Sequence, residues 1–133
     1  MSEAQLKRVL FVCVENSNRS QMAEAFARLH GLGRIDAYSA GSRPSGKINS
    51  KAVEAMRELG YDLTRHQSKS LGDIAGLSFD AAVTMGCGDA CPNVPAKLRE
   101  DWNIPDPRDM LPAQFRDVRD LIERKVENLL PTL

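Results

Sequence analysis

The sequence has no long apolar segment, no excess of one charge and few cysteines. The apolar run at residues 9–14 is far shorter than the roughly 20 residues of a membrane-spanning helix, and too short for the core of a signal peptide. The 18 basic and 18 acidic residues cancel, so the global charge indicates neither a nucleic-acid nor a membrane partner. Three cysteines, an odd number, do not make a disulfide framework. We expect a cytoplasmic protein whose thiols stay reduced.

Short apolar runs alternate with helical patterns along the 133 residues, a length typical of one domain. Buried strands are expected at residues 8–13, 35–40 and 79–85, with a further short strand near residues 66–69. Helices are expected at residues 20–32, 50–59 and 111–130, the second of them capped by Ser50. Strands that alternate with helices predict a parallel sheet with right-handed crossovers. In such sheets ligands bind beyond the carboxyl ends of the strands.

The first helix has the pattern of an amphipathic helix. Met22, Phe26 and Leu29 fall on one apolar stripe. Glu24 and Arg28 are spaced four residues apart, as an ion pair along a helix requires. This helix is therefore expected to pack its stripe against the sheet.

The loop between the first strand and this helix has the residues of a nucleophile and an anion site. Cys13 ends the strand, and Arg19 opens the helix after five intervening residues. Backbone amides of a short loop at a helix N-terminus bind anions, and the arginine fork adds two donors. The same positive field favours the thiolate of Cys13, which is the attacking form. Ser20 can hydrogen-bond that thiolate, and Asn16 tolerates the unusual backbone angles of a tight loop.

Each of these residues also has an ordinary interpretation. A cysteine at a strand end is often a small core residue, and an arginine in a first helical turn is often exposed. Cys13 and Arg19, however, lie between a buried strand and an amphipathic helix, and Ser20 and Asn16 lie in the same stretch. This combination favours a catalytic role over a core cysteine and an exposed arginine.

The stretch from Val12 to Phe26, VCVENSNRSQMAEAF, resembles the phosphate-binding loop and first helix of the low-molecular-weight protein tyrosine phosphatase superfamily. Its RSQMAE continuation resembles the arsenate reductase branch, of the thioredoxin-coupled type. The resemblance implies the phosphotyrosine phosphatase I-like fold over residues 1–133, a single-domain three-layer α/β sandwich with a central four-stranded parallel sheet. It also implies an anion-binding loop with these members: Cys13, Val14, Glu15, Asn16, Ser17, Asn18 and Arg19.

Two positions of the loop depart from the family pattern. Glu15 stands where the family often has glycine, and Asn18 where it often has a second cysteine. Glu15 places a carboxylate beside an anion site, and we expect that carboxylate to point to solvent.

Cys87 and Cys91 lie in a Gly, Asp, Asn and Pro-containing loop after the third predicted strand. Reduction of arsenate needs two electrons, which two thiols supply by forming a disulfide, whereas a phosphatase has no use for them. By resemblance, Cys13 attacks arsenate, and Cys87 then attacks Cys13, which releases arsenite and leaves a Cys13–Cys87 disulfide. Cys91 attacks in turn, and the disulfide becomes Cys87–Cys91. Half of a zinc site and plain structural thiols are the alternatives, and no second Cys/His pair favours zinc.

The reductant that restores the thiols stays open at this point. The resemblance implies thioredoxin, but thioredoxin-coupled relatives usually space the two loop cysteines further apart. A low-molecular-weight thiol with a glutaredoxin-type partner is the alternative. The spacing also leaves open which loop thiol attacks first.

Asp106 lies between two prolines and matches the general-acid segment of the family. A carboxyl group that protonates the leaving oxygen contributes about 10²–10⁴-fold in rate. The alternative is an ordinary Asp-Pro turn. Arg108 follows where phosphatases of this family carry an aromatic residue, and a charged rim suits a small inorganic anion.

By the same resemblance, Asn16, Glu24 and Ser39 match positions that surround a potassium ion in some relatives. Lys69 stands where those relatives have a carboxylate, and an ammonium there can replace the ion, so we expect no bound potassium. We also expect no other metal and no bound cofactor. His30 and His66 are expected at the surface, since neither has a motif around it.

Three hypotheses follow. The first is a monomeric arsenate reductase with residual phosphatase activity, in which Cys13, Arg19, Ser20, Cys87, Cys91 and Asp106 are catalytic. The second is a tyrosine phosphatase that hydrolyses phosphomonoesters through a Cys13 phosphoenzyme. The third is a non-catalytic binding or redox-sensing module, which Glu15 favours.

Overall fold

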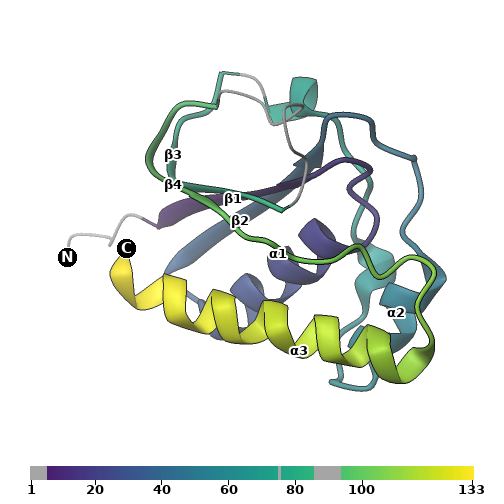
Figure 1. Cartoon of the computed structure of the whole chain (residues 1–133). Helices are drawn as coiled ribbons and strands as arrows, with labels where there is room; N and C mark the ends of the chain where they lie inside the picture. Colours follow the sequence, from purple (N-terminus) through teal and green to yellow (C-terminus); the bar gives the residue numbers. More distant parts are fainter. Residues whose placement is uncertain (1–5, 75, 86–93) are drawn as a thin grey trace.

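The computed structural model describes residues 6–74, 76–85 and 94–133 (Figure 1). Its centre is a sheet of four parallel strands in the order β2-β1-β3-β4. The strands are β1 (Lys7–Cys13), β2 (Ile35–Gly41), β3 (Phe79–Thr84) and β4 (Ala96–Asp101). β1 lies between two partners, and its residues from Val9 to Val12 are at most 1% exposed. The apolar run that predicted this strand is thus the middle of the sheet.

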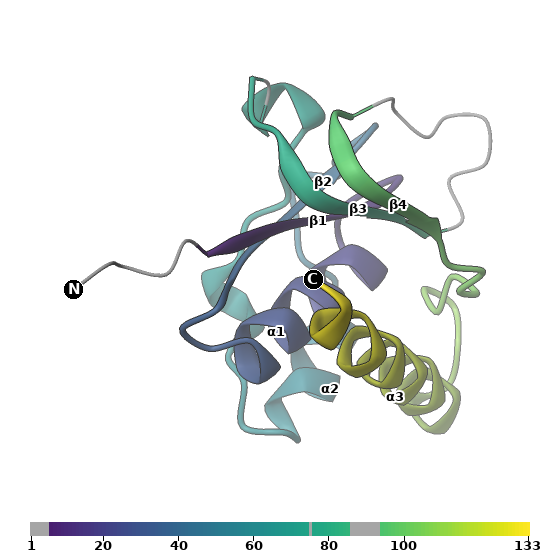
Figure 2. The same cartoon turned by 90° about the vertical axis from the view of Figure 1, so that its left-hand side faces the viewer.

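Three helices cover one face of the sheet, as Figure 2 shows: α1 (Arg19–His30), α2 (Ser50–Arg57) and α3 (Pro112–Leu129). Val9, Phe11 and Cys13 of β1 contribute to the core on this face. Leu10 and Val12 contribute to a second core on the opposite face, because successive side chains of a strand point to opposite sides. Cys13 therefore belongs to the helix-covered face.

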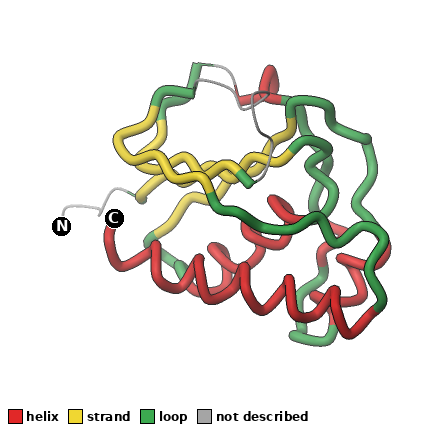
Figure 3. Tube along the Cα trace, in the orientation of Figure 1, coloured by secondary structure: helices red, strands yellow, loops and turns green. Residues whose placement is uncertain are grey.

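The second face is covered by short segments rather than by long helices in the described part of the chain. Ile74 of the 3₁₀ helix η2 (Leu71–Ile74) packs there, with Leu77 and Val94 partly buried beside it. Figure 3 shows this short helix on the side of the sheet opposite the three longer ones. Two further 3₁₀ turns are η1 (Leu63–Arg65) and η4 (Leu130–Thr132). The predicted layered α/β fold with four parallel strands is confirmed.

The fourth strand is not where the sequence predicted it. Residues 66–69 form no strand, and near them only Gly41 and Ser70 form an isolated bridge. The fourth strand is β4, at the edge of the sheet, where Lys97, Arg99 and Glu100 are exposed. An edge strand pairs on one side only and carries charge at little cost, so it lacks the apolar run of a buried strand.

Smaller corrections concern the helices. Asn49, not Ser50, caps α2, because its Oδ1 accepts a hydrogen bond from the Lys51 amide at 2.9 Å. In α1, Met22 and Phe26 are fully buried as predicted, but Leu29 is 45% exposed, in a last turn whose residues 28–30 are all exposed. No helix in the described residues has the length and apolarity to cross a membrane.

Candidate active site

Cys13 lies at the carboxyl end of β1 and is 3% exposed. It lines a cavity of about 500 Å³, whose other walls come from the loop before α1 and from the segment after β4. The predicted members Val14, Glu15, Ser17, Asn18, Arg19 and Asp106 line the same cavity, together with Asn103, Ile104 and Arg108. Segments far apart in the sequence therefore meet where the topology placed the ligand.

The carbonyl groups of the loop are held from outside. Val14 O accepts from the Arg43 amide at 2.8 Å, and Ser17 O accepts from the Asn49 amide at 3.1 Å. Glu15 O accepts twice, from the Ser45 amide and the Ser68 hydroxyl, each at 3.0 Å. Among the described residues, the amides of residues 14–18 have no hydrogen-bond acceptor. Buried amides need a partner, so a loop held this way suits a bound anion.

Asn16 holds the loop from behind. Its backbone φ is 52°, the left-handed region that asparagine tolerates. Its side-chain nitrogen donates to Ser20 Oγ at 2.8 Å, and its Oδ1 accepts from the Lys69 amide at 2.7 Å. Ser20 Oγ lies 2.8 Å from Cys13 Sγ. Because Ser20 Oγ accepts from Asn16, its own proton is free for the Cys13 sulfur, which suits a thiolate nucleophile.

A further set of buried side chains extends this network, and the sequence did not indicate it. Gln21 is fully buried, and its Nε2 donates to Asn16 Oδ1 at 2.8 Å. Gln21 Oε1 accepts from His66 Nδ1 at 2.9 Å, and His66 Nε2 then accepts from the Tyr61 hydroxyl at 2.6 Å. These partners are five to 45 residues apart, so no local pattern could reveal them.

The surface position predicted for His66 is wrong. Its side chain is only 6% exposed, because Gln21 and Tyr61 satisfy both ring nitrogens in the interior. Burial lowers the pKa of His66 below its ordinary value, although the nearby Glu24 carboxylate opposes that shift. Burial likewise raises the pKa of the Tyr61 hydroxyl. Both groups are therefore neutral around pH 7 and suit a structural network.

Arg19 and Asp106 face each other across the cavity. The Arg19 side chain is 10% exposed, and its Nη1 donates to the Ile104 carbonyl at 3.0 Å. Its Nη2 lies 4.0 Å from Asp106 Oδ2, and the Asp106 side chain is 45% exposed. The guanidinium is thus fixed beside the loop amides, and a carboxyl group stands over the anion site.

Glu15 does not simply point to solvent as predicted. Its Oε2 accepts from Arg108 Nη1 at 2.8 Å, so the opposite charge across the cavity holds the carboxylate at the rim. Glu15 is therefore paired with Arg108, which stands where phosphatases of the family carry an aromatic residue.

Glu24 is the centre of a buried charge cluster at the back of α1. Its carboxylate is 4% exposed, accepts from Ser39 Oγ at 2.5 Å and from Arg28 Nε at 2.9 Å. The Lys69 ammonium lies 3.7 Å from Glu24 Oε1. The predicted Glu24–Arg28 pair is thus present, and the Lys69 ammonium lies beside the same carboxylate.

Cys87 and Cys91 lie outside the described residues, so the roles predicted for them stay predictions. Cys13 is a free thiol with respect to the residues that the structure describes.

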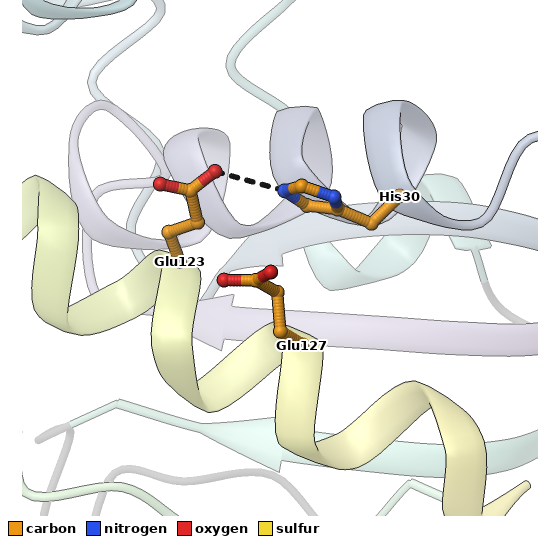
Figure 4. A group of neighbouring side chains, drawn as sticks. All are labelled: His30, Glu123 and Glu127. Atoms are coloured by element: carbon orange, nitrogen blue, oxygen red, sulfur yellow. Dashed lines mark hydrogen bonds and ion pairs between the residues drawn. The ribbon is translucent and has the colours of Figure 1, made fainter.

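One other cluster contains residues that bind metals in proteins. His30 at the end of α1 faces Glu123 and Glu127 on α3, and its Nε2 lies 2.8 Å from Glu123 Oε2 (Figure 4). His30 is exposed, as predicted. α1 begins at the cavity and runs away from it, so its 12 residues separate this cluster from Arg19 by roughly 17 Å. The cluster therefore joins the two helices and takes no part in the chemistry at Cys13.

Comparisons with known proteins agree with this geometry. The low molecular weight phosphotyrosine protein phosphatase family matches residues 8–133. A relative from Synechocystis sp., named glutaredoxin arsenate reductase, is 36% identical over 94% of this chain and 97% of its own length.

Solved structures resemble the whole chain as well. One, described as an arsenate reductase in the phosphate binding state, has a TM-score of 0.85 at 34% identity, over 96% of this chain and 98% of that one. A thioredoxin-dependent arsenate reductase from Corynebacterium glutamicum has a TM-score of 0.82 at 29% identity, over 98% of this chain and 63% of that one. On its cavity, its fold and these matches, the chain belongs to the low-molecular-weight phosphotyrosine protein phosphatase family.

Proposed function

We propose that the protein reduces arsenate to arsenite, with Cys13 as the nucleophile. The observation that carries this proposal is the position of Cys13, which shares one cavity with Arg19, Asp106 and loop amides that have no protein acceptor in the described residues. Such a site binds a tetrahedral oxyanion with a sulfur beneath it. The relatives named arsenate reductases favour arsenate as that oxyanion.

The first step forms a bond between sulfur and arsenic. The Cys13 thiolate attacks the arsenic of arsenate, and a hydroxyl group leaves as water with a proton from Asp106. Arg19 and the loop amides hold the remaining oxygens and stabilise their charge. Before the attack, the Ser20 hydroxyl donates a hydrogen bond to the Cys13 sulfur and stabilises its thiolate. The product is a thioester of arsenate on Cys13, with arsenic still in its oxidised state.

The second step transfers two electrons to arsenic. The Cys87 thiolate attacks the Cys13 sulfur, a disulfide forms, and the electron pair of the sulfur–arsenic bond leaves with arsenic as arsenite. The Cys91 thiolate then attacks Cys87 and releases the Cys13 thiolate. An external dithiol reduces the Cys87–Cys91 disulfide and closes the cycle. The two steps that follow the release of arsenite are thiol–disulfide exchanges.

A coupled assay tests this function. With arsenate, thioredoxin, thioredoxin reductase and NADPH, the wild-type protein should consume NADPH in proportion to arsenate. Cys13→Ser should remove all turnover, and Cys87→Ser or Cys91→Ser should remove multiple turnover. If either loop variant keeps the wild-type steady-state rate, the proposed cascade is wrong.

The same assay can identify the physiological reductant. Thioredoxin and glutaredoxin-type partners are both represented among the relatives by name. Replacing thioredoxin with glutathione and glutaredoxin in the same assay decides between them, and the faster system identifies the reductant. This chemistry needs a reducing compartment, so we place the protein in the cytoplasm. We also expect a monomer, which light scattering of the purified protein checks.

Phosphomonoester hydrolysis is the second candidate, because the family is one of phosphatases and the described part of the site suffices for it. Cys13, Arg19 and Asp106 would then form and hydrolyse a phosphoenzyme without the other cysteines. Aryl-phosphate hydrolysis with kcat/KM above that for arsenate, and unchanged in Cys87→Ser, would favour the phosphatase.

We also propose that the protein needs no potassium ion. The Lys69 ammonium 3.7 Å from Glu24 supplies the positive charge that a cation would bring to this carboxylate. Exchange of potassium for sodium should leave turnover and thermal stability unchanged in the wild type. Lys69→Asn should make both depend on potassium.

A further inference from the structure

The pair of Glu15 and Arg108 joins two separate segments across the mouth of the cavity. Glu15 belongs to the loop after β1, and Arg108 belongs to the segment between β4 and α3, 93 residues further along the chain. Their side chains meet at 2.8 Å, and both line the cavity that contains Cys13. The ion pair is thus part of the rim that a ligand passes when it enters the cavity.

Both backbones at this contact are anchored. Glu15 O accepts from the Ser45 amide and the Ser68 hydroxyl. Arg108 O accepts from Lys51 Nζ at 2.8 Å. An ordinary ion pair at a protein surface is weak, largely because two free side chains must be ordered. Here the two main chains are already held by other hydrogen bonds, so the two side chains stay within reach of each other across the cavity.

Arg108 also contacts the candidate acid. Its amide donates to Asp106 Oδ1 at 3.1 Å, while Asp106 Oδ2 faces Arg19. In an in-line attack by Cys13, the leaving oxygen of the anion lies opposite the sulfur, near this carboxyl group. A substituent on that oxygen would leave the cavity past Asp106 and Arg108. A hydroxyl group needs no such exit.

The charges of the pair have a second effect. Alone, the Glu15 carboxylate would repel an oxyanion from the loop amides. The Arg108 guanidinium at 2.8 Å offsets that charge, so the loop keeps its affinity for anions. The pair can therefore narrow the mouth without making it negative.

We propose that Glu15 and Arg108 form a clasp that admits small inorganic oxyanions to Cys13 and excludes esters with a bulky group on the leaving oxygen. This inference rests on the proposed function, in which Cys13 attacks a bound oxyanion. It deepens that function by naming the substrate class, inorganic arsenate and phosphate rather than aryl phosphates.

Protection of Cys13 from iodoacetamide measures binding without any turnover. Alkylation of the Cys13 peptide is followed by mass spectrometry at increasing concentrations of inorganic phosphate or of phenylphosphonate. For each anion, the midpoint is the concentration that gives half-maximal protection of Cys13. The quantity compared between variants is the midpoint for phenylphosphonate divided by the midpoint for phosphate. Both probes are anions of similar charge, so a change in the charge of the rim affects both and cancels in the ratio.

The variants are Glu15→Ala, Arg108→Ala and the double variant, with Arg57→Ala as control. Arg57 pairs with Glu54 on α2, away from the cavity, and its loss removes one positive charge in the same way. Either single substitution breaks the clasp, so each should lower the ratio at least fivefold. The double variant should lower the ratio no further than the singles, and the control should keep the wild-type ratio.

Two results would overturn the clasp while leaving the function intact: a ratio that no variant changes, or single effects that multiply in the double variant. The latter would mean that the two residues act independently. If inorganic phosphate does not protect Cys13 of the wild-type protein from alkylation, the proposed function itself is contradicted, and the clasp with it.

Discussion

Asn16 shows how one residue can hold a whole loop at the scale of single side chains. It combines a positive φ with side-chain hydrogen bonds to the buried residues Ser20 and Gln21 and to the backbone amide of the partly buried Lys69. Its side-chain Nδ2 donates a hydrogen bond to Ser20 Oγ, so the hydroxyl proton of Ser20 is free to bond the Cys13 sulfur. The sequence indicated the first property, tolerance of unusual backbone angles, and could not reveal the bonds.

Asn16→Ala should lower the free energy of unfolding by about 3 kcal/mol, because it leaves buried donors and acceptors without partners. Asn16→Gly loses the same bonds but accepts the positive φ more easily, so it should be about 1 kcal/mol less destabilised. Urea unfolding of the three proteins measures both differences. Equal midpoints for the wild type and Asn16→Ala would show that the network does not stabilise the loop.

His66 predicts how stability depends on pH. Burial lowers its pKa in the folded protein, so below the ordinary value of 6.5 the unfolded chain binds a proton more readily than the folded one. The free energy of unfolding should therefore fall as the pH drops from about 7 to about 5.5. Glu24 favours the charged ring, whereas Arg28 and Lys69 disfavour it.

His66→Gln removes this titration and keeps an amide that can bond Gln21. Its unfolding free energy should change less over the same pH range than that of the wild type, as urea titrations at both ends of the range would show. A variant with the wild-type pH dependence would mean that the ring is already protonated, or free to leave the interior.

At the scale of elements, the junction of β2 with the anion loop leaves no room for a side chain. Gly41 ends β2, and a Cβ atom added there would lie 2.5 Å from the Val14 carbonyl oxygen and 3.0 Å from the Asn16 amide. Both neighbours are backbone atoms that cannot rotate away. Gly41 directly follows the strand predicted at residues 35–40, and the structure gives the steric reason for a glycine there.

Gly41→Ala should therefore destabilise the protein by about 1–3 kcal/mol and displace the loop that holds the anion. Thermal unfolding and phosphate protection of Cys13 measure these two effects. Gly72→Ala is the matched control, because the nearest atom to its added Cβ is 3.4 Å away on the Ser70 side chain. A stable Gly41→Ala with normal phosphate protection would contradict the tight junction.

The elements that could be predicted are those with a local signal. β1 and the buried face of α3 follow from apolar periodicity, since Phe115, Val118 and Ile122 are all buried. β4 has no such signal, because a charged edge strand resembles a polar loop in sequence. The exposed Leu29 is the opposite failure, since the periodicity of a helix continues past the point where its packing ends.

At the scale of the whole molecule, the site is assembled from segments that only the fold brings together. Cys13, Arg19 and Ser20 could be found because they are close in sequence and have the spacing of an anion loop. Asp106 could be found through resemblance alone. The network through Gln21 and His66, and the pair of Glu15 with Arg108, depend on contacts 45 and 93 residues apart, which no local pattern encodes.

The proposed chemistry depends on Cys13, whose sulfur attacks arsenate and then forms a disulfide with a second thiol. The most direct measurement is mass mapping of the cysteine pairs in Cys91→Ser, quenched after a single turnover with arsenate. One equivalent of arsenite and a disulfide between Cys13 and Cys87 are expected, since Cys91, the thiol that would resolve this disulfide, is gone. Arsenite formed with Cys13 still a free thiol would contradict the account.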